Sequence, residues 1–236
     1  MPNNGVFDNW VSNTKSLLPK VGSTMGKIIS FSLFGSRPKY THGAVNNVIV
    51  CKDLYPDFVC RFYIANDVPR EIVCRLIEEG AEIVMRNERS DNRRGSFWRY
   101  CVAFDPSVDI FLCRDCDSTP SFREVDAVNQ WLESEKMVHI MRDHSSHWRK
   151  KILGGMWGAK RNWIDLVKFG VILEKYYSHS RSANYGYDET MLDDVYGCVK
   201  NVAMIHDDAE SNASEFRVKI NGGNFVGKPN CEIPKI

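Results

Sequence analysis

The chain of 236 residues lacks a long hydrophobic run. Its first 26 residues contain no apolar core of the roughly 7 to 15 residues that a secretory signal peptide needs. No later segment reaches the ~18 uncharged apolar residues of a membrane span. We therefore expect no transmembrane segment and a soluble protein that works in the cytoplasm.

An excess of basic charge is also missing. Lys and Arg number 31 against 30 for Asp and Glu, whereas proteins that bind the phosphate backbone of nucleic acids carry a basic surplus. The composition therefore argues against nucleic acid as the partner. With 43% hydrophobic residues, the chain can bury the core of one large α/β domain.

Cysteine is too scarce for a disulfide scaffold, since eight residues are spread over the whole chain. This usage fits a reducing compartment. Cys113 and Cys116 have the CxxC spacing of a redox or zinc motif, but no second CxxC supplies the remaining zinc ligands. The neighbouring Asp115 and Asp117 should raise the pKa of these thiols rather than lower it. The redox and zinc interpretations are therefore disfavoured alternatives.

What the sequence does contain is a regular alternation of strand and helix patterns from Lys27 onward. Strands are predicted for residues 27–35, 58–65, 81–86 and 108–113, and helices between them for residues 42–56, 68–80 and 95–106. This βαβ alternation predicts a mostly parallel sheet with helices on its faces. Later helices are predicted for residues 121–134, 162–177 and 187–199, and later strands for residues 137–143 and 200–208.

The fourth predicted strand, "VDIFLC", ends on the acidic segment "RDCDS". Asp115 and Asp117 therefore fall at the carboxyl edge of the sheet, where ligands of such sheets bind. Two neighbouring carboxylates repel each other unless a cation offsets their charge. Carboxylate oxygens suit Mg²⁺ or Mn²⁺, whose other positions are filled by water and substrate phosphates. The segment predicts a divalent metal site, and the alternative is a solvated turn in which Asp117 caps the next segment.

The order of motifs along residues 27–208 resembles that of glycosyltransferases of the GT-A fold. The resemblance is carried by "ISFSLFG", the Arg of "GSFWRY", "FLCRDCDS", "REVDAVNQWLES", "HIMRDHSSH", "ILGGMWGAKR" and "YDETMLDDVY". The RDxDS block is its most specific part, and the order is most similar to that of enzymes from bacterial polysaccharide loci and large algal viruses. The resemblance implies an α/β, Rossmann-like GT-A nucleotide-diphospho-sugar transferase fold. Residues 1–26 are then an N-terminal extension, and residues 209–236 a C-terminal segment that packs on or near the active site.

The resemblance also implies roles for individual residues. Asp117 would be the main metal ligand, Asp115 would contact the ribose or a second metal position, and His206 would be a third metal ligand. The nucleotide would be lined by the first strand and a nearby arginine, namely Phe31, Leu33, Gly35 and Arg99. This chain departs from the family in one respect, because no DxH or HxxGxxKPW motif follows and "VGKPN" at residues 226–230 is only a partial match.

Two further segments offer chemistry beside the acidic motif. In "LGGMWG" the glycines permit a close backbone approach, and Trp157 could stack on a sugar ring or belong to the core. In "YDETMLDD", which lies where the GT-A family carries an acidic site residue, the resemblance implies Asp188 as the first choice and Glu189 as the second for the group that removes a proton from the acceptor. The acidic start of a helix explains these carboxylates equally well. The candidate phosphate-binding cations are Arg37, Lys39, Arg93, Arg94 and Lys228.

We therefore expect a metal-dependent hexosyltransferase that uses Mn²⁺ or Mg²⁺. It would transfer a hexose or deoxyhexose from a nucleoside-diphosphate sugar, with UDP as the expected nucleotide, to a hydroxyl of a glycan or glycoprotein. The alternatives are a sugar nucleotidyltransferase, which releases pyrophosphate, and a non-catalytic carbohydrate-binding module, which needs neither metal nor nucleotide. A zinc hydrolase built on His144 and His147 is a more distant alternative. The cytoplasm would be that of a host cell if the chain is viral.

Overall fold

The computed structural model describes residues 14–17, 26–87, 93–180, 184–220, 223–230 and 232–234. Within them, one eight-stranded sheet has the strand order β1-β4-β3-β2-β5-β7-β6-β8. Its strands are β1 (Thr14–Leu17), β2 (Gly26–Leu33), β3 (Val59–Ala65), β4 (Glu82–Arg86), β5 (Val108–Cys113), β6 (Val138–Arg142), β7 (Trp157–Lys160) and β8 (Ala203–Asp207). The helices are α2 (Pro38–Leu54), α3 (Arg70–Glu78), the 3₁₀ helix η1 (Arg93–Phe104), α4 (Phe122–Glu133), α5 (Leu166–His179) and α6 (Tyr187–Val199).

The sheet is mostly parallel. β2 runs parallel to β3 and β5, β3 runs parallel to β4, and β6 runs parallel to β8. β1 and β7 run antiparallel to their neighbours. The carboxyl ends of the parallel strands therefore meet at one edge of the sheet. The α/β class predicted from the sequence, with a mostly parallel central sheet flanked by helices, is confirmed.

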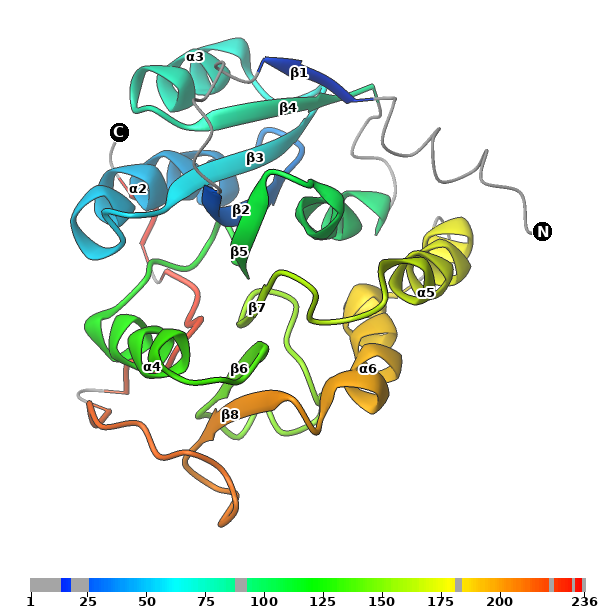
Figure 1. Cartoon of the computed structure of the whole chain (residues 1–236). Coiled ribbons are helices and arrows are strands. Elements are labelled where there is room, and N and C mark those ends of the chain that lie inside the picture. The colour runs from blue at the N-terminus through cyan, green and yellow to red at the C-terminus, as the bar shows by residue number, and fades with distance from the viewer. Residues whose placement is uncertain are drawn as a thin grey trace.

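Helices cover both faces of this sheet. Figure 1 shows α2 and α4 on one side and α5 and α6 on the other. Successive residues of β2 point to opposite faces, so that Ile28 joins the core under η1, α5 and α6 while Ile29 joins the core under α2, α3 and α4. Both faces of the central strands are thus buried, as expected for parallel strands between helices. The described helices are all too short or too polar to cross a membrane.

Most predicted elements occur at the predicted places, and the differences lie at their ends. The helix expected at residues 162–177 begins at Leu166, because Asp165 caps it by accepting hydrogen bonds from the backbone N–H groups of Val167 and Lys168. Ser121 caps α4 by accepting from the N–H of Glu124, as predicted. The helix expected at residues 95–106 is a 3₁₀ helix.

The predicted N-terminal extension is described in part. Residues 14–17 form β1, which pairs with β4 at the edge of the sheet and was not predicted. Residues 1–13 and 18–25 lie outside the described residues. β2, the first strand predicted from the sequence, begins at Gly26, one residue before its predicted start.

A buried ion pair fixes the chain where it leaves β5. The Nε atom of Arg114 donates to Oε1 of Glu124 at 2.7 Å, and both side chains are only 2% exposed. Arg114 Nη1 donates to the carbonyl oxygens of Cys113 and Trp157, and the hydroxyl of Tyr55 donates to the same oxygen of Glu124 at 3.0 Å. The end of β5 is thereby tied to α4, β7 and the C-terminal end of α2.

Loss of this pair should destabilise the fold. We expect Glu124→Ala to lower the free energy of unfolding by about 3 to 5 kcal/mol, because it leaves the guanidinium of Arg114 buried without its counter-ion. Urea denaturation followed by circular dichroism measures the change. The matched control is Asp109→Ala in β5, whose ion pair with Arg161 spans 3.0 Å but is partly exposed. The control should cost no more than about 1 kcal/mol, and equal losses in the two variants would contradict an anchoring role for the buried pair.

Candidate functional site

Asp115 and Asp117 lie just beyond the carboxyl end of β5, as predicted. We call residues 115–117 the acidic loop. It rests on the first turns of α2, because Asn47 Nδ2 donates to the carbonyl oxygen of Cys116 at 3.2 Å. A β-carbon on Gly43 would overlap that same oxygen, so only glycine allows α2 to come this close. The contact holds the start of α2 beside the loop.

Two basic side chains offset the repulsion between the carboxylates of this loop. Lys39 Nζ lies 2.7 Å from Oδ2 of Asp117, and Arg99 forms an ion pair with Asp115 through Nη1. The side chains of Asp117 and Asp115 are 16% and 43% exposed. Both carboxylates are therefore paired and still accessible to a ligand from solvent.

Arg99 also joins the acidic loop to the N-terminus of α6. Its Nη2 donates to Oδ2 of Asp188 at 2.9 Å, and that oxygen accepts a second hydrogen bond from the hydroxyl of Tyr100 at 3.0 Å. The backbone of Arg99 is held by β2, since its N–H donates to Ser32 Oγ and its carbonyl accepts from Ser30 Oγ. One guanidinium thus connects β2, the acidic loop and α6.

The loop before β7 closes the site from another side. A β-carbon on Gly155 would overlap Oδ2 of Asp115, and one on Gly154 would crowd the guanidinium of Arg99. The N–H of Gly154 donates to Oε1 of Glu189 at 3.3 Å. The close backbone approach that the sequence predicts for these glycines therefore occurs, and it is directed at the charged groups.

The two candidate proton acceptors, Asp188 and Glu189, sit in different surroundings. Asp188 is buried and accepts from Arg99 and Tyr100. Burial, and next the charge of Asp188, raises the pKa of Glu189. A carboxylate with a raised pKa and few partners is the better proton acceptor of the two.

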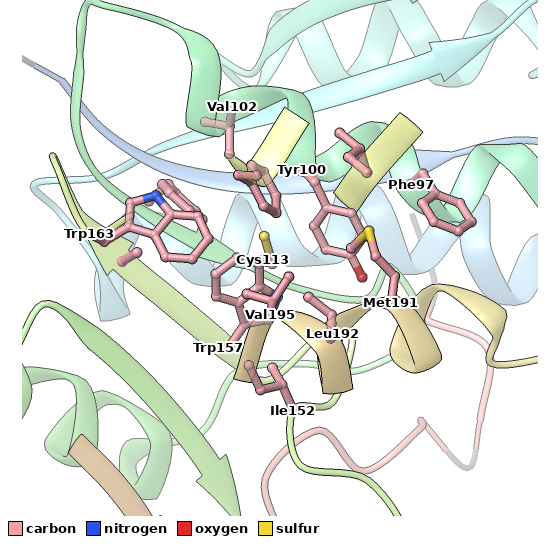
Figure 2. Packing of buried hydrophobic residues seen from close by; sticks show 14 of the residues in the cluster. Phe97, Tyr100, Val102, Cys113, Ile152, Trp157, Trp163, Met191, Leu192 and Val195 are labelled. Carbon is pink, nitrogen blue, oxygen red and sulfur yellow. The ribbon is translucent and has the colours of Figure 1, made fainter. Parts of the chain in front are cut away.

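Three residues expected to touch the donor are in the core instead. Phe31 and Leu33 are 0% and 1% exposed, and the ring of Phe31 stacks on that of Phe62 at 4.6 Å between centroids. Trp157 is fully buried and packs against Trp163 (Figure 2). None of the three presents a side-chain surface to a ligand, so we leave them out of the site; for Trp157 the core interpretation is correct.

His206 is not brought to the acidic loop. It lies inside β8, three strands away from β5 in the sheet order, a separation of about 14 Å at the usual strand spacing. Its ring is fully buried, and its Nδ1 lies 2.9 Å from Nε2 of His139. The predicted set of Asp115, Asp117 and His206 is therefore not assembled, and among the described residues no group of three or more His, Cys, Asp or Glu side chains is placed to hold a metal ion.

Gly35 and Lys228 have local roles in the structure. Gly35 follows β2 at the carboxyl edge with a φ of 73°, a conformation that favours glycine, and its N–H donates to Oδ1 of Asp67. Lys228 Nζ donates to the carbonyl of Gly223 and to the side chain of Asn224, within its own turn. Gly35 thus shapes the turn at the carboxyl edge of the sheet, whereas the ammonium group of Lys228 is hydrogen-bonded within its own turn.

Described residues of the C-terminal segment contact the acidic loop and its neighbours. Ser118 forms an antiparallel bridge with Pro229, and the N–H of Asn230 donates to the carbonyl of Asp117 at 2.7 Å. The N–H of Val226 donates to the carboxylate of Asp143. The contact from Asn230 fixes the backbone of Asp117, and the same segment also touches α2, since the carbonyl oxygen of Pro234 lies 3.1 Å from Nδ1 of His42.

The cysteine and histidine motifs that suggested redox or zinc chemistry contain side chains packed against the rest of the protein. Cys113 and Cys116 are buried free thiols. Burial raises the pKa of Cys113 to about 12, and burial followed by the charges of Asp115 and Asp117 raises the pKa of Cys116. The ring of His144 stacks on Phe225 with 4.1 Å between centroids. Burial is the larger cause for both thiols, whereas the sequence pointed to the neighbouring carboxylates. Among the described residues, neither motif belongs to a group of three or more side chains placed to hold a metal ion.

The sequence did not reveal the link between Arg99 and Asp188, which lie 89 positions apart. No local pattern joins residues at such a distance. The pairing of Lys39 with Asp117 was also missed, although Lys39 was a candidate for phosphate binding. A lysine in the first turn of a helix that follows the first strand is the available signal, since that turn also lies at the carboxyl edge.

Comparisons with protein-family models and with curated proteins find no match. Among solved structures, the chain is similar to a 4-diphosphocytidyl-2C-methyl-D-erythritol synthase from Anaerococcus prevotii, with 13% identity over 84% of this chain and 93% of the other and a TM-score of 0.46. A glycosyltransferase involved in glycosylation of the major capsid of PBCV-1 has 14% identity over 77% and 81% with a TM-score of 0.45. Glucosyl-3-phosphoglycerate synthase from Mycobacterium tuberculosis, in complex with Mn²⁺ and uridine-diphosphate-glucose, has 12% identity over 87% and 73% with a TM-score of 0.47. Because these identities are so low, the proposal of a function below is based on the residues of this chain.

The thiols should differ sharply in reactivity. We expect iodoacetamide to modify the exposed Cys74 and Cys198 in the native protein, while Cys113 and Cys116 react only after unfolding, because the thiolate is the reactive form and burial disfavours it. Peptide mass spectrometry before and after guanidinium treatment measures the pattern. Rapid native modification of Cys113 or Cys116 would instead support the redox interpretation.

Proposed function

We propose that residues 27–208 form a glycosyltransferase domain of the GT-A type that takes its sugar from a nucleoside diphosphate, with UDP as the nucleotide. The observation that carries the proposal is the pair of accessible carboxylates, Asp115 and Asp117, at the carboxyl edge of the parallel sheet with Arg99 beside them. Open α/β sheets bind their ligands at this edge. The RDxDS motif supports the same assignment.

A divalent ion fits the residues around Asp115. Two carboxylates supply oxygen ligands, and the side chain of Asp115 is 43% exposed, so an ion can reach it from solvent. Mg²⁺ and ions like it are commonly held by one or two carboxylates together with water and substrate phosphates, so a third protein ligand is not required. We assign Asp117 as the main ligand and Asp115 as the second, without His206. A bound Mn²⁺ or Mg²⁺ would stabilise the negative charge that develops on the leaving diphosphate.

The chain's own groups would supply the rest of the chemistry. Transfer breaks the bond between the sugar and the diphosphate, and the acceptor hydroxyl forms a new bond to the sugar and loses its proton. Glu189 is our choice to receive that proton, because its pKa is raised and Gly154 N–H is its backbone partner. Arg99 keeps Asp115 oriented and adds fixed positive charge near the leaving group. Asp188 acts through Arg99 and is a positioning residue.

Nucleotide binding tests the donor site directly. Calorimetric titration with UDP should show binding that depends on Mn²⁺, and Asp117→Asn should abolish the metal-dependent part while leaving the thermal unfolding temperature nearly unchanged. Asp109→Asn, a partly exposed carboxylate of β5, is the matched control and should bind as the unaltered protein does. If UDP, GDP and dTDP all fail to bind with and without Mn²⁺, the proposed function is wrong.

A second experiment separates the roles of the two α6 carboxylates. Glu189→Gln should reduce turnover about 10²- to 10⁴-fold, the usual contribution of a positioned proton acceptor, with little effect on UDP affinity. Asp188→Asn should weaken UDP binding as well, because Arg99 loses a charged partner. Asp194→Asn, an exposed position of the same helix that pairs with Lys175, serves as the control. Normal turnover in Glu189→Gln would exclude this residue as the proton acceptor.

A further inference from the structure

Arg99 and Lys39, whose positive charges balance the carboxylates of the acidic loop, are held in very different ways. The side chain of Arg99 is 8% exposed and donates to Asp188 and to the carbonyl of Arg114. The side chain of Lys39 is 43% exposed; it contacts Asp117, and its Nζ lies 5.5 Å from the ring centroid of Tyr40. Breaking a buried, multiply bonded pair is costly, whereas a partly exposed lysine pair contributes little. Lys39 can therefore leave its carboxylate, and Arg99 cannot.

The backbone beneath Lys39 stays where it is when the side chain moves. Pro38 begins α2, and the helix is fixed to the acidic loop through Gly43 and through the hydrogen bond from Asn47 to the Cys116 carbonyl. Lys39 thus carries its ammonium group on a flexible four-carbon stem above a fixed base. The ammonium remains within reach of any group that binds at Asp117.

We propose that Lys39 is an exchangeable counter-ion: it neutralises Asp117 in the donor-free protein and moves to the donor's diphosphate when a divalent ion takes Asp117. This inference rests on the proposed function. A divalent ion bound to Asp117 at the roughly 2.1 Å of a metal–oxygen contact would stand next to the ammonium, and the two cations would repel each other. Phosphate oxygens close to the ion offer the ammonium a new anionic partner.

The exchange couples the ion to the donor. The pair of Lys39 and Asp117 is neutral, so an ion that binds alone adds two uncompensated positive charges beside the ammonium. The diphosphate of a nucleotide sugar brings two negative charges and offsets them. Lys39 therefore opposes binding of the ion alone and favours binding of the ion together with the donor, which is a positive coupling between the two ligands.

Removal of the ammonium should change the two affinities in opposite directions. In calorimetric titrations, we expect Lys39→Met to bind Mn²⁺ alone about two- to fivefold more tightly, since an ion pair of this exposure contributes that much. The same variant should bind UDP in saturating Mn²⁺ about tenfold more weakly, because a charge-assisted hydrogen bond is lost. Lys39→Arg keeps the charge and should restore most of both affinities.

The controls separate this inference from the proposed function. Lys175→Met removes an exposed lysine that lies 3.1 Å from Asp194, away from the acidic loop, and should change neither affinity. Suppose that the unaltered protein binds UDP with Mn²⁺. If Lys39→Met then changes the affinities for Mn²⁺ and for UDP in the same direction, or changes neither affinity, the proposed exchange is wrong and the proposed function stands. If the unaltered protein binds no nucleotide with Mn²⁺, the proposed function itself is wrong.

Discussion

The arrangement of the candidate site depends on one buried guanidinium shared by two carboxylates. Arg99 pairs with Asp115 in the acidic loop and with Asp188 at the start of α6, while serines of β2 hold its backbone. A charge in this position is tolerated only when its partners stay in place, because an unpaired buried charge is strongly destabilising. The need to keep Arg99 paired therefore fixes the distance between the end of β5 and α6, and with it the shape of the ligand edge.

Burial decides which of the charged groups can respond to a ligand. The pair of Arg114 and Glu124 and the pair of Arg99 and Asp188 are both enclosed by protein and gain from mutual attraction in a medium of low polarity. Lys39 is much more exposed, and water competes for its ammonium group. The site thus combines a rigid ionic framework below the surface with a mobile cation above it. Such a division allows a diphosphate to displace one ion pair without disturbing the others.

The sequence predicted the elements better than it predicted the partners of each side chain. Strand alternation, the capping of α4 by Ser121 and the place of Asp115 and Asp117 follow from local patterns. The burial of Phe31 and Trp157 does not follow from a local pattern, because an aromatic side chain can either pack in a core or stack on a sugar ring. His206 was misjudged for a different reason. The strand order places β7 and β6 between β5 and β8, and no local pattern encodes the order in which strands assemble.

Besides the ion pairs of Arg99, three glycines hold the segments around the acidic loop close together. Gly43 lets α2 rest on the Cys116 carbonyl, Gly155 lets the loop before β7 meet the Asp115 carboxylate, and Gly154 makes room for the Arg99 guanidinium. At each point a β-carbon would force apart segments that the buried ion pairs hold together. The acidic loop is therefore enclosed by backbone on two sides and by a fixed positive charge on a third. The side chain of Lys39 is 43% exposed beside this loop, so an anion that arrives from solvent can meet its ammonium group.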